Sequence, residues 1–186
     1  MYPLLLFLHG SGERGGDLEH VGDHGLPLIL PRLPEPTLVL APQCPEDMRW
    51  TDHLQHLEAI LEETIAQYAV DPTRVYLTGL SMGGQGAWYL AAHTPERFAA
   101  VVPICGRSNP DAAARLKHLP IWVFHGDSDD VIALSESEIM VDALHETGSD
   151  AKLTVYPGVG HDSWSLAYST PELYDWLFAQ RFQALS

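Results

Sequence analysis

Cationic residues are scarce in this chain. Its 186 residues include 10 Lys and Arg against 25 Asp and Glu, which gives a formal net charge of -15. A surface this acidic repels phosphate backbones and anionic lipid headgroups, so nucleic acid and membrane surfaces are not expected as partners. The sequence also lacks any apolar run near the roughly 20 residues that a membrane-spanning helix needs. The composition is that of a globular domain.

Cysteine is rare as well, with Cys44 and Cys105 as its only instances. Two are too few for a disulfide framework, and their spacing matches no zinc motif. The N-terminal residues lack the cationic start and small-residue cleavage site of a signal peptide, so the apolar run at residues 4–8 is predicted to be a core strand. The compartment stays undetermined, and a domain cut from a longer, secreted precursor is one interpretation of so early a strand.

What the chain does contain is a regular alternation of short apolar runs and helical patterns. This alternation is typical of a mainly parallel sheet covered on both faces. We predict one α/β domain over residues 1–186, a three-layer α/β/α sandwich around six strands. The expected strands are residues 4–8, 37–41, 74–78, 99–103, 121–124 and 152–156, and the expected helices are residues 52–70, 82–93, 135–147 and a last one from Pro171.

The most informative motif is G-x-S-x-G at residues 79–83, between a predicted strand and a predicted helix. A strand, a sharp turn and a helix are the context of a nucleophile elbow, in which the turn holds a serine in left-handed backbone geometry and exposes its hydroxyl. Small flanking residues let the helix and the strand pack closely enough for such a turn. Ser81 is therefore the candidate nucleophile.

A serine hydroxyl needs a histidine base, and the chain has ten histidines. In the elbow architecture the order along the chain is serine, acid, histidine, which excludes all histidines before Ser81. His145 and His161 are the later ones that follow a strand-end acid. His145 lies inside a predicted helix, whereas His161 lies in a glycine-rich loop after the last strand. We predict that His161 is the base.

The acid is expected where the strand at residues 121–124 ends. The loop that follows contains three carboxylates, Asp127, Asp129 and Asp130. Asp129 lies deep enough in the loop to reach a histidine from the next strand, while Asp127 is placed to cap the turn and Asp130 to face solvent. Local reasoning favours Asp129 without excluding its neighbours.

Acyl transfer also requires donors for the developing oxyanion. In an elbow these come from the backbone N–H after the nucleophile and from the loop after an early strand. Residues 8–12, L-H-G-S-G, end the first predicted strand with glycines that let the backbone approach a ligand. The expected donors are the N–H groups of Met82 and Ser11.

Taken together, these motifs resemble the α/β-hydrolase serine esterases, in the branch of carboxylesterase/phospholipase and polyhydroxybutyrate-depolymerase-like proteins often labelled predicted peptidases. The matching stretches are residues 8–15, 41–45, 77–84, 102–106, 124–126 and 160–164. The resemblance implies that Asp129 is the acid and that Cys44 and Cys105 are free thiols. It also implies a minimal α/β-hydrolase fold without the usual N-terminal hairpin, which would leave the strand at residues 37–41 at an open sheet edge. We expect an upstream domain, a second copy of the chain or the flanking Pro36 and Pro42 to protect this edge.

The segment at residues 107–119, where many α/β-hydrolases insert a lid, has room for one small helix, which predicts an open, shallow cleft. Trp50 and Trp164 are candidate substrate-binding walls, although either side chain could instead fill the core. We therefore expect hydrolysis of small, short-chain carboxylic esters through an acyl-enzyme, with no metal and no organic cofactor. The alternatives are a peptidase, a thioesterase, a feruloyl or acetyl esterase of plant cell walls, and a non-catalytic binding module.

Overall fold

Six strands form one sheet in which every neighbouring pair is parallel. The computed structural model describes residues 1–182. Its strand order is β2-β1-β3-β4-β5-β6, so β2 and β6 are the two edges. The strands are β1 (Tyr2–Leu8), β2 (Leu38–Leu40), β3 (Val70–Leu80), β4 (Ala100–Ile104), β5 (Trp122–Gly126) and β6 (Lys152–Tyr156).

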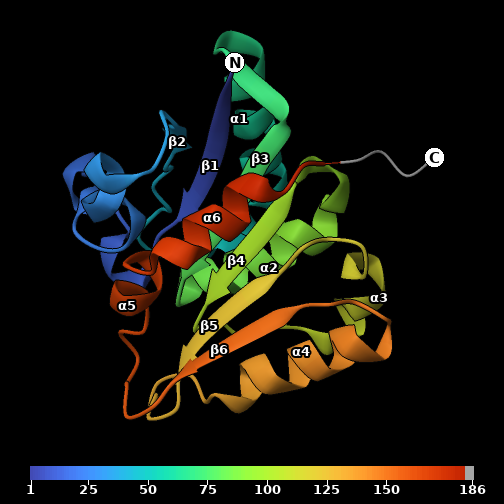
Figure 1. Ribbon diagram of the computed structural model, residues 1–186. Helices are drawn as coiled ribbons and strands as arrows, with labels where there is room; N and C mark the ends of the chain where they lie inside the picture. Colours follow the sequence, from blue (N-terminus) through green and yellow to red (C-terminus); the bar gives the residue numbers. More distant parts are fainter. Residues whose placement is uncertain (183–186) are drawn as a thin grey trace.

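Helices cover both faces of this sheet, and Figure 1 shows α6 in front of it with α2 behind. One face packs against α1 (Leu54–Gln67), α2 (Met82–His93), α3 (Ala113–Leu116) and α4 (Ser135–Glu146). The other packs against the 3-10 helix η3 (Leu26–Arg32), α5 (Trp164–Tyr168) and α6 (Pro171–Ala179). The predicted three-layer α/β/α sandwich with a six-stranded parallel sheet is therefore confirmed.

The side chains of β1 show how one strand serves both cores. Leu4, Leu6 and Leu8 belong to the core on the α1 and α2 face, whereas Leu5 and Phe7 belong to the core on the α6 face. Successive side chains of a strand point to opposite faces, so an uninterrupted apolar run is what a strand buried on both faces requires.

The connection between α1 and β3 differs from the prediction. The helix was expected to continue to Asp71-Pro72, but α1 ends at Gln67 and Val70 already pairs with Tyr2. The register between β1 and β3 then shifts, so that Leu4 pairs with Val75. Pro72 lies in this irregular stretch, where the N–H that proline lacks is not needed for a ladder bond.

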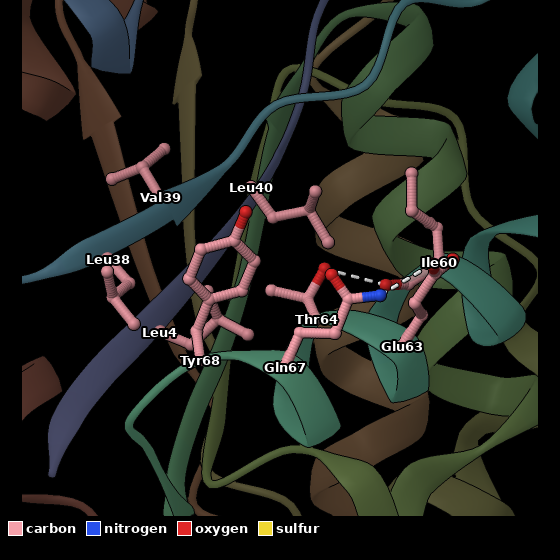
Figure 2. Close-up of a pocket in the computed structure, with 9 residues that line it drawn as sticks. All are labelled: Leu4, Leu38, Val39, Leu40, Ile60, Glu63, Thr64, Gln67 and Tyr68. Atoms are coloured by element: carbon pink, nitrogen blue, oxygen red, sulfur yellow. Dashed lines mark hydrogen bonds between the residues drawn. The ribbon is translucent and has the colours of Figure 1, made fainter.

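The open edge at β2 borders a groove toward α1, drawn in Figure 2. The groove has a volume of about 280 Å³, and the ring of Tyr68 lies between the two elements. Its other lining residues are Leu4, Leu38, Val39, Leu40, Ile60, Glu63, Thr64 and Gln67. That an upstream domain, a second copy or the flanking prolines protect this edge stays a prediction.

The carboxyl ends of the strands lie at one end of the sheet. The chain leaves β1 toward β2 on one side and returns to β3 on the other, so β1 and β3 flank a topological switch point. Ligands of open parallel sheets bind at such points. Among residues 1–182, no helix has the length and apolar character that crossing a bilayer requires.

Candidate active site

Ser81 stands at the turn between β3 and α2. Its backbone has φ 54 and ψ -116, one of two positive φ values found at non-glycine positions in the described chain. The φ sign agrees with the predicted elbow, while the ψ value lies outside the left-handed helical region. Backbone hydrogen bonds hold this conformation, since the Ser81 N–H donates to Ile104 O at 3.0 Å and the Gln85 N–H donates to Ser81 O at 3.0 Å. Strain of this kind at a non-glycine residue is typical of functional sites.

Close backbone contacts around the elbow explain two of its glycines. A Cβ on Gly83 would lie 1.8 Å from Leu8 O, and a Cβ on Gly79 would lie 2.3 Å from Gly83 O. Both contacts are far below van der Waals distance and involve backbone atoms that the sheet holds in place. The start of α2 thus packs directly on the ends of β1 and β3, which brings Ser81 next to the loop after β1.

His161 bridges Ser81 and Asp129. Its Nε2 lies 2.8 Å from Ser81 Oγ, and its Nδ1 lies 2.7 Å from Asp129 Oδ2. Because a carboxylate only accepts, Nδ1 carries the proton and Nε2 is free to accept from the serine hydroxyl. The His161 side chain is 19% exposed and that of Asp129 is 0% exposed. Ser81, His161 and Asp129, the three side chains predicted from the sequence, therefore form one hydrogen-bonded chain at the carboxyl ends of the strands.

Of the three candidate carboxylates, Asp129 is the one that contacts the histidine. Its Oδ1 accepts from the N–H groups of Val131 and Ile132, both at 2.9 Å. Burial by itself would raise the pKa of Asp129, but the hydrogen bonds from His161 and from these two N–H groups outweigh it and lower the pKa. Asp129 is therefore ionised at neutral pH.

The neighbouring carboxylates have other surroundings. Asp127 Oδ1 accepts from the Gly158 N–H at 2.7 Å and from the Ser128 hydroxyl at 2.9 Å, so it caps the turn, while Asp130 is exposed. The other candidate histidine, His145, lies in α4 and contacts Ala151 O at 2.8 Å.

The backbone N–H groups of Ser11 and Met82 have no acceptor among the described residues. Ser11 begins the 3-10 helix η1 (Ser11–Glu13), and Met82 begins α2. A Cβ placed on Gly10 would lie 3.8 Å from Ser81 Cβ, so the loop that carries Ser11 is next to the nucleophile candidate. These are the two predicted oxyanion donors.

The buried side chain of His9 stabilises the loop after β1 through two hydrogen bonds. Its ring is 1% exposed, its Nδ1 donates to Gly10 O at 2.6 Å, and its Nε2 accepts from the Cys44 N–H at 3.0 Å. Burial lowers the pKa of His9, which keeps the ring neutral and preserves both bonds.

The prediction that Trp50 walls the pocket is wrong. Trp50 is 2% exposed, its Nε1 donates to His9 O at 2.9 Å, and its ring stands edge-on to that of His9 at 4.9 Å. It supports the loop from the core, where substrate cannot reach it. The Trp164 ring is partly exposed and perpendicular to the His161 ring, with centroids 5.4 Å apart, so substrate contact by Trp164 stays a prediction.

Two polar residues near the site were not predicted. Glu13 follows Ser11 in η1, is 7% exposed, and accepts from His24 Nδ1 at 2.7 Å. His125 is 0% exposed, and its Nε2 lies 3.2 Å from Asp129 Oδ2. The signal for His125 was its place in the motif at residues 124–126, directly at a strand end.

A metal ion has one conceivable position among the described residues. Ligand atoms of Cys105, Asp129 and His161 all lie within 4.8 Å of one another. However, Asp129 and His161 already bond each other, and burial raises the pKa of the Cys105 thiol to about 12, so this thiol is protonated and a poor ligand. Both cysteines are free and buried.

The family model of the dienelactone hydrolases matches residues 44–166, a stretch that contains Ser81, Asp129 and His161. The chain belongs to the dienelactone hydrolase family. Its α/β-hydrolase fold and its likeness to esterases confirm the resemblance inferred from the motifs.

Among the proteins similar to this chain are two esterases of known structure and one curated relative. A thermostable esterase superimposes with a TM-score of 0.86 at 35% identity, covering 97% of this chain and 55% of that chain. Esterase PE8 superimposes with a TM-score of 0.67 at 25% identity, covering 90% of each chain. The bifunctional acetylxylan esterase/xylanase XynS20E of Neocallimastix patriciarum is 27% identical over 144 residues, 73% of this chain and 20% of that protein. The chain thus spans about a fifth of this curated relative. These relatives agree with the predicted carboxylic ester hydrolase.

Proposed function

We propose that this domain hydrolyses short-chain carboxylic esters through an acyl-enzyme on Ser81. The observation that carries the proposal is the hydrogen-bonded chain from Ser81 Oγ through His161 to Asp129, at 2.8 and 2.7 Å. A serine, an imidazole and a buried carboxylate in this geometry are the machinery of nucleophilic acyl transfer. The esterase relatives support the same chemistry.

In the proposed first half-reaction, Ser81 Oγ attacks the ester carbonyl carbon while His161 Nε2 takes the hydroxyl proton. The carbonyl electron pair moves onto oxygen, where the free N–H groups of Met82 and Ser11 are the proposed donors. Collapse of this intermediate breaks the bond to the alcohol oxygen, which takes the proton from His161. The acyl group then remains on Ser81.

In the second half-reaction, water replaces the alcohol. His161 takes a proton from the water as its oxygen attacks the acyl carbon, and it returns that proton to Ser81 as the carboxylic acid departs. Throughout, the Nδ1–H stays on His161, and the ionised Asp129 stabilises the transient imidazolium.

The preference for small acyl groups is supported by the segment between β4 and β5. It folds into only the 3-10 helix η6 (Pro110–Ala112) and the four-residue α3, and both pack against α4. Two elements this short form no large lid, and a lid would supply the apolar wall that a long acyl chain needs.

The test is steady-state hydrolysis of p-nitrophenyl acetate, butyrate and octanoate by the wild type and by Ser81→Ala, with Ser149→Ala as a matched control in a turn after α4. We expect Ser81→Ala to lose at least about 1000-fold in kcat and Ser149→Ala to keep the wild-type rate. We also expect kcat/KM to fall from acetate to octanoate. Equal rates for wild type and Ser81→Ala would refute the proposal and favour a binding module.

A second candidate is an acetyl esterase acting on polymeric substrates, favoured by the acetylxylan esterase relative. An open cleft would admit a polysaccharide chain, and acetate release from acetylated xylan is the direct assay. A peptidase, a thioesterase or a feruloyl esterase would use the same side chains. Matched acetyl anilide, acetyl thioester and methyl ferulate substrates separate these alternatives, and we expect the oxygen ester of acetate to be hydrolysed fastest.

A further inference from the structure

His125 is a second imidazole in contact with the carboxylate of the candidate triad. It lies in β5, four residues before Asp129, and both side chains are 0% exposed. Its Nε2 lies 3.2 Å from Asp129 Oδ2, the same oxygen that accepts from His161 Nδ1 at 2.7 Å. The acid of the triad therefore lies between two histidines.

The hydrogen bonds of His125 define which of its nitrogens carries the proton. Nε2 lies 2.9 Å from Ile132 O, and a carbonyl only accepts, so Nε2 is the donor. Nδ1 lies 2.7 Å from Ser137 Oγ. The Nε2–H directs its positive end toward the Ile132 carbonyl and lies beside the Asp129 carboxylate.

The backbone of Ile132 forms a second link between His125 and Asp129. Its N–H donates to Asp129 Oδ1 at 2.9 Å, while its carbonyl oxygen accepts from His125. His125 thus holds the turn that binds one carboxylate oxygen and contacts the other oxygen directly. Without it, Asp129 would keep its bonds to backbone N–H groups but lose the group that fixes the turn against β5.

We propose that His125 is a positioning residue, which holds Asp129 in the orientation that aligns His161 with Ser81. This inference rests on the proposed triad. A carboxylate that can rotate about its Cβ–Cγ bond orients the imidazole less well. The hydrogen bond from His125 to the Ile132 carbonyl fixes the turn whose N–H binds Asp129 Oδ1, and this limits that rotation. The expected consequence is a fall in kcat with little change in KM, since His125 touches no substrate.

The matched variants are His125→Gln and His125→Met, whose side chains are similar in length. Gln places an N–H donor near the position of Nε2, whereas Met places none. We expect His125→Met to lower kcat about 10- to 100-fold with KM within about twofold, and His125→Gln to recover most of that loss. The amide of His125→Asn is one methylene shorter than that of Gln and places no donor at the Nε2 position, so Asn is the second variant without a donor at that position should the Met variant not fold.

A double-mutant cycle separates positioning from general support of the fold. Because His125 acts through Asp129, adding His125→Met or His125→Asn to Asp129→Asn should change kcat by less than about twofold. Met140→Ala removes a buried side chain from α4, one turn from Ser137, and is the control for lost packing, with kcat expected to stay at the wild-type value.

Three results would overturn the inference: an equal loss of kcat in the wild-type and Asp129→Asn backgrounds, a Gln variant as slow as the Met variant, or wild-type kcat in both donor-lacking variants. Each of these leaves Ser81→Ala inactive. Failure of the proposed function instead shows as equal rates for wild type and Ser81→Ala.

Discussion

His161 Nε2 lies 2.8 Å from Ser81 Oγ, although 80 residues separate the two in the sequence. The parallel sheet explains the approach, because β3 and β6 both end at the same side of the molecule and their loops extend past the same edge. The glycine-rich loop after β6 passes the carboxyl ends of β5 and β4, at Gly126 and Cys105, and its His161 reaches the elbow.

His161→Gln tests the role of this bond. Gln keeps a polar side chain but cannot take and return the serine proton at neutral pH, so we expect a loss in kcat of at least about 1000-fold. Because the residues of a triad act as a unit, adding His161→Gln to Ser81→Ala should cost almost nothing more. Comparison of single and double variants on p-nitrophenyl acetate is the measurement, and additive losses would contradict the triad.

Gly83→Ala tests the close packing of the elbow. Its Cβ would lie 1.8 Å from Leu8 O, which cannot move without disturbing β1. We expect a loss of about 3 kcal/mol or more in the free energy of unfolding, measured by urea denaturation, together with reduced activity. Gly22→Ala is the control, because a Cβ there meets nothing within 4 Å, and its stability should stay within about 0.5 kcal/mol of wild type. Wild-type stability of Gly83→Ala would contradict the described contact.

Asp129 makes the stability of the protein depend on pH. Its pKa in the folded state is below the ordinary value of 3.8, so its ionised form stabilises the fold at every pH above 3.8. That contribution is lost as the pH falls below 3.8 through the lower folded-state pKa. We expect the difference in unfolding free energy between wild type and Asp129→Asn to shrink as the pH falls from 5 toward 3. Denaturation curves across this pH range measure the difference. A difference that grows on acidification would contradict a lowered pKa for Asp129 in the folded state.

The Cys105 thiol is expected to be unreactive despite its position near Asp129 and His161. It is 0% exposed, and burial raises its pKa to about 12, so almost no thiolate is present at pH 8. Iodoacetamide at pH 8 should leave the native protein unmodified over an hour and alkylate it fully in denaturant, as followed by intact mass. Rapid modification of Cys105 in the native protein would show that the thiol is accessible.

Much of this protein is determined by local sequence. The apolar runs that form β1 and β3 predict strands buried on both faces, and glycines at positions 79 and 83 next to Ser81 predict a turn that only small residues allow. These features depend on side-chain size and backbone freedom within a few residues. The order of serine, acid and histidine then follows from the order of the strands.

The tertiary structure decided what depends on distances between remote segments. Asp127, Asp129 and Asp130 are the same kind of residue in one loop, and only the approach of the loop after β6 distinguishes Asp129 from the others. Trp50 looks equally suited to a pocket or a core until its contact with His9, 41 residues away, is known. The place of His125 beside Asp129 likewise depends on how the acid loop folds back on β5. Side-chain type limits what a residue can bond, but its neighbours in space determine which of those bonds it makes.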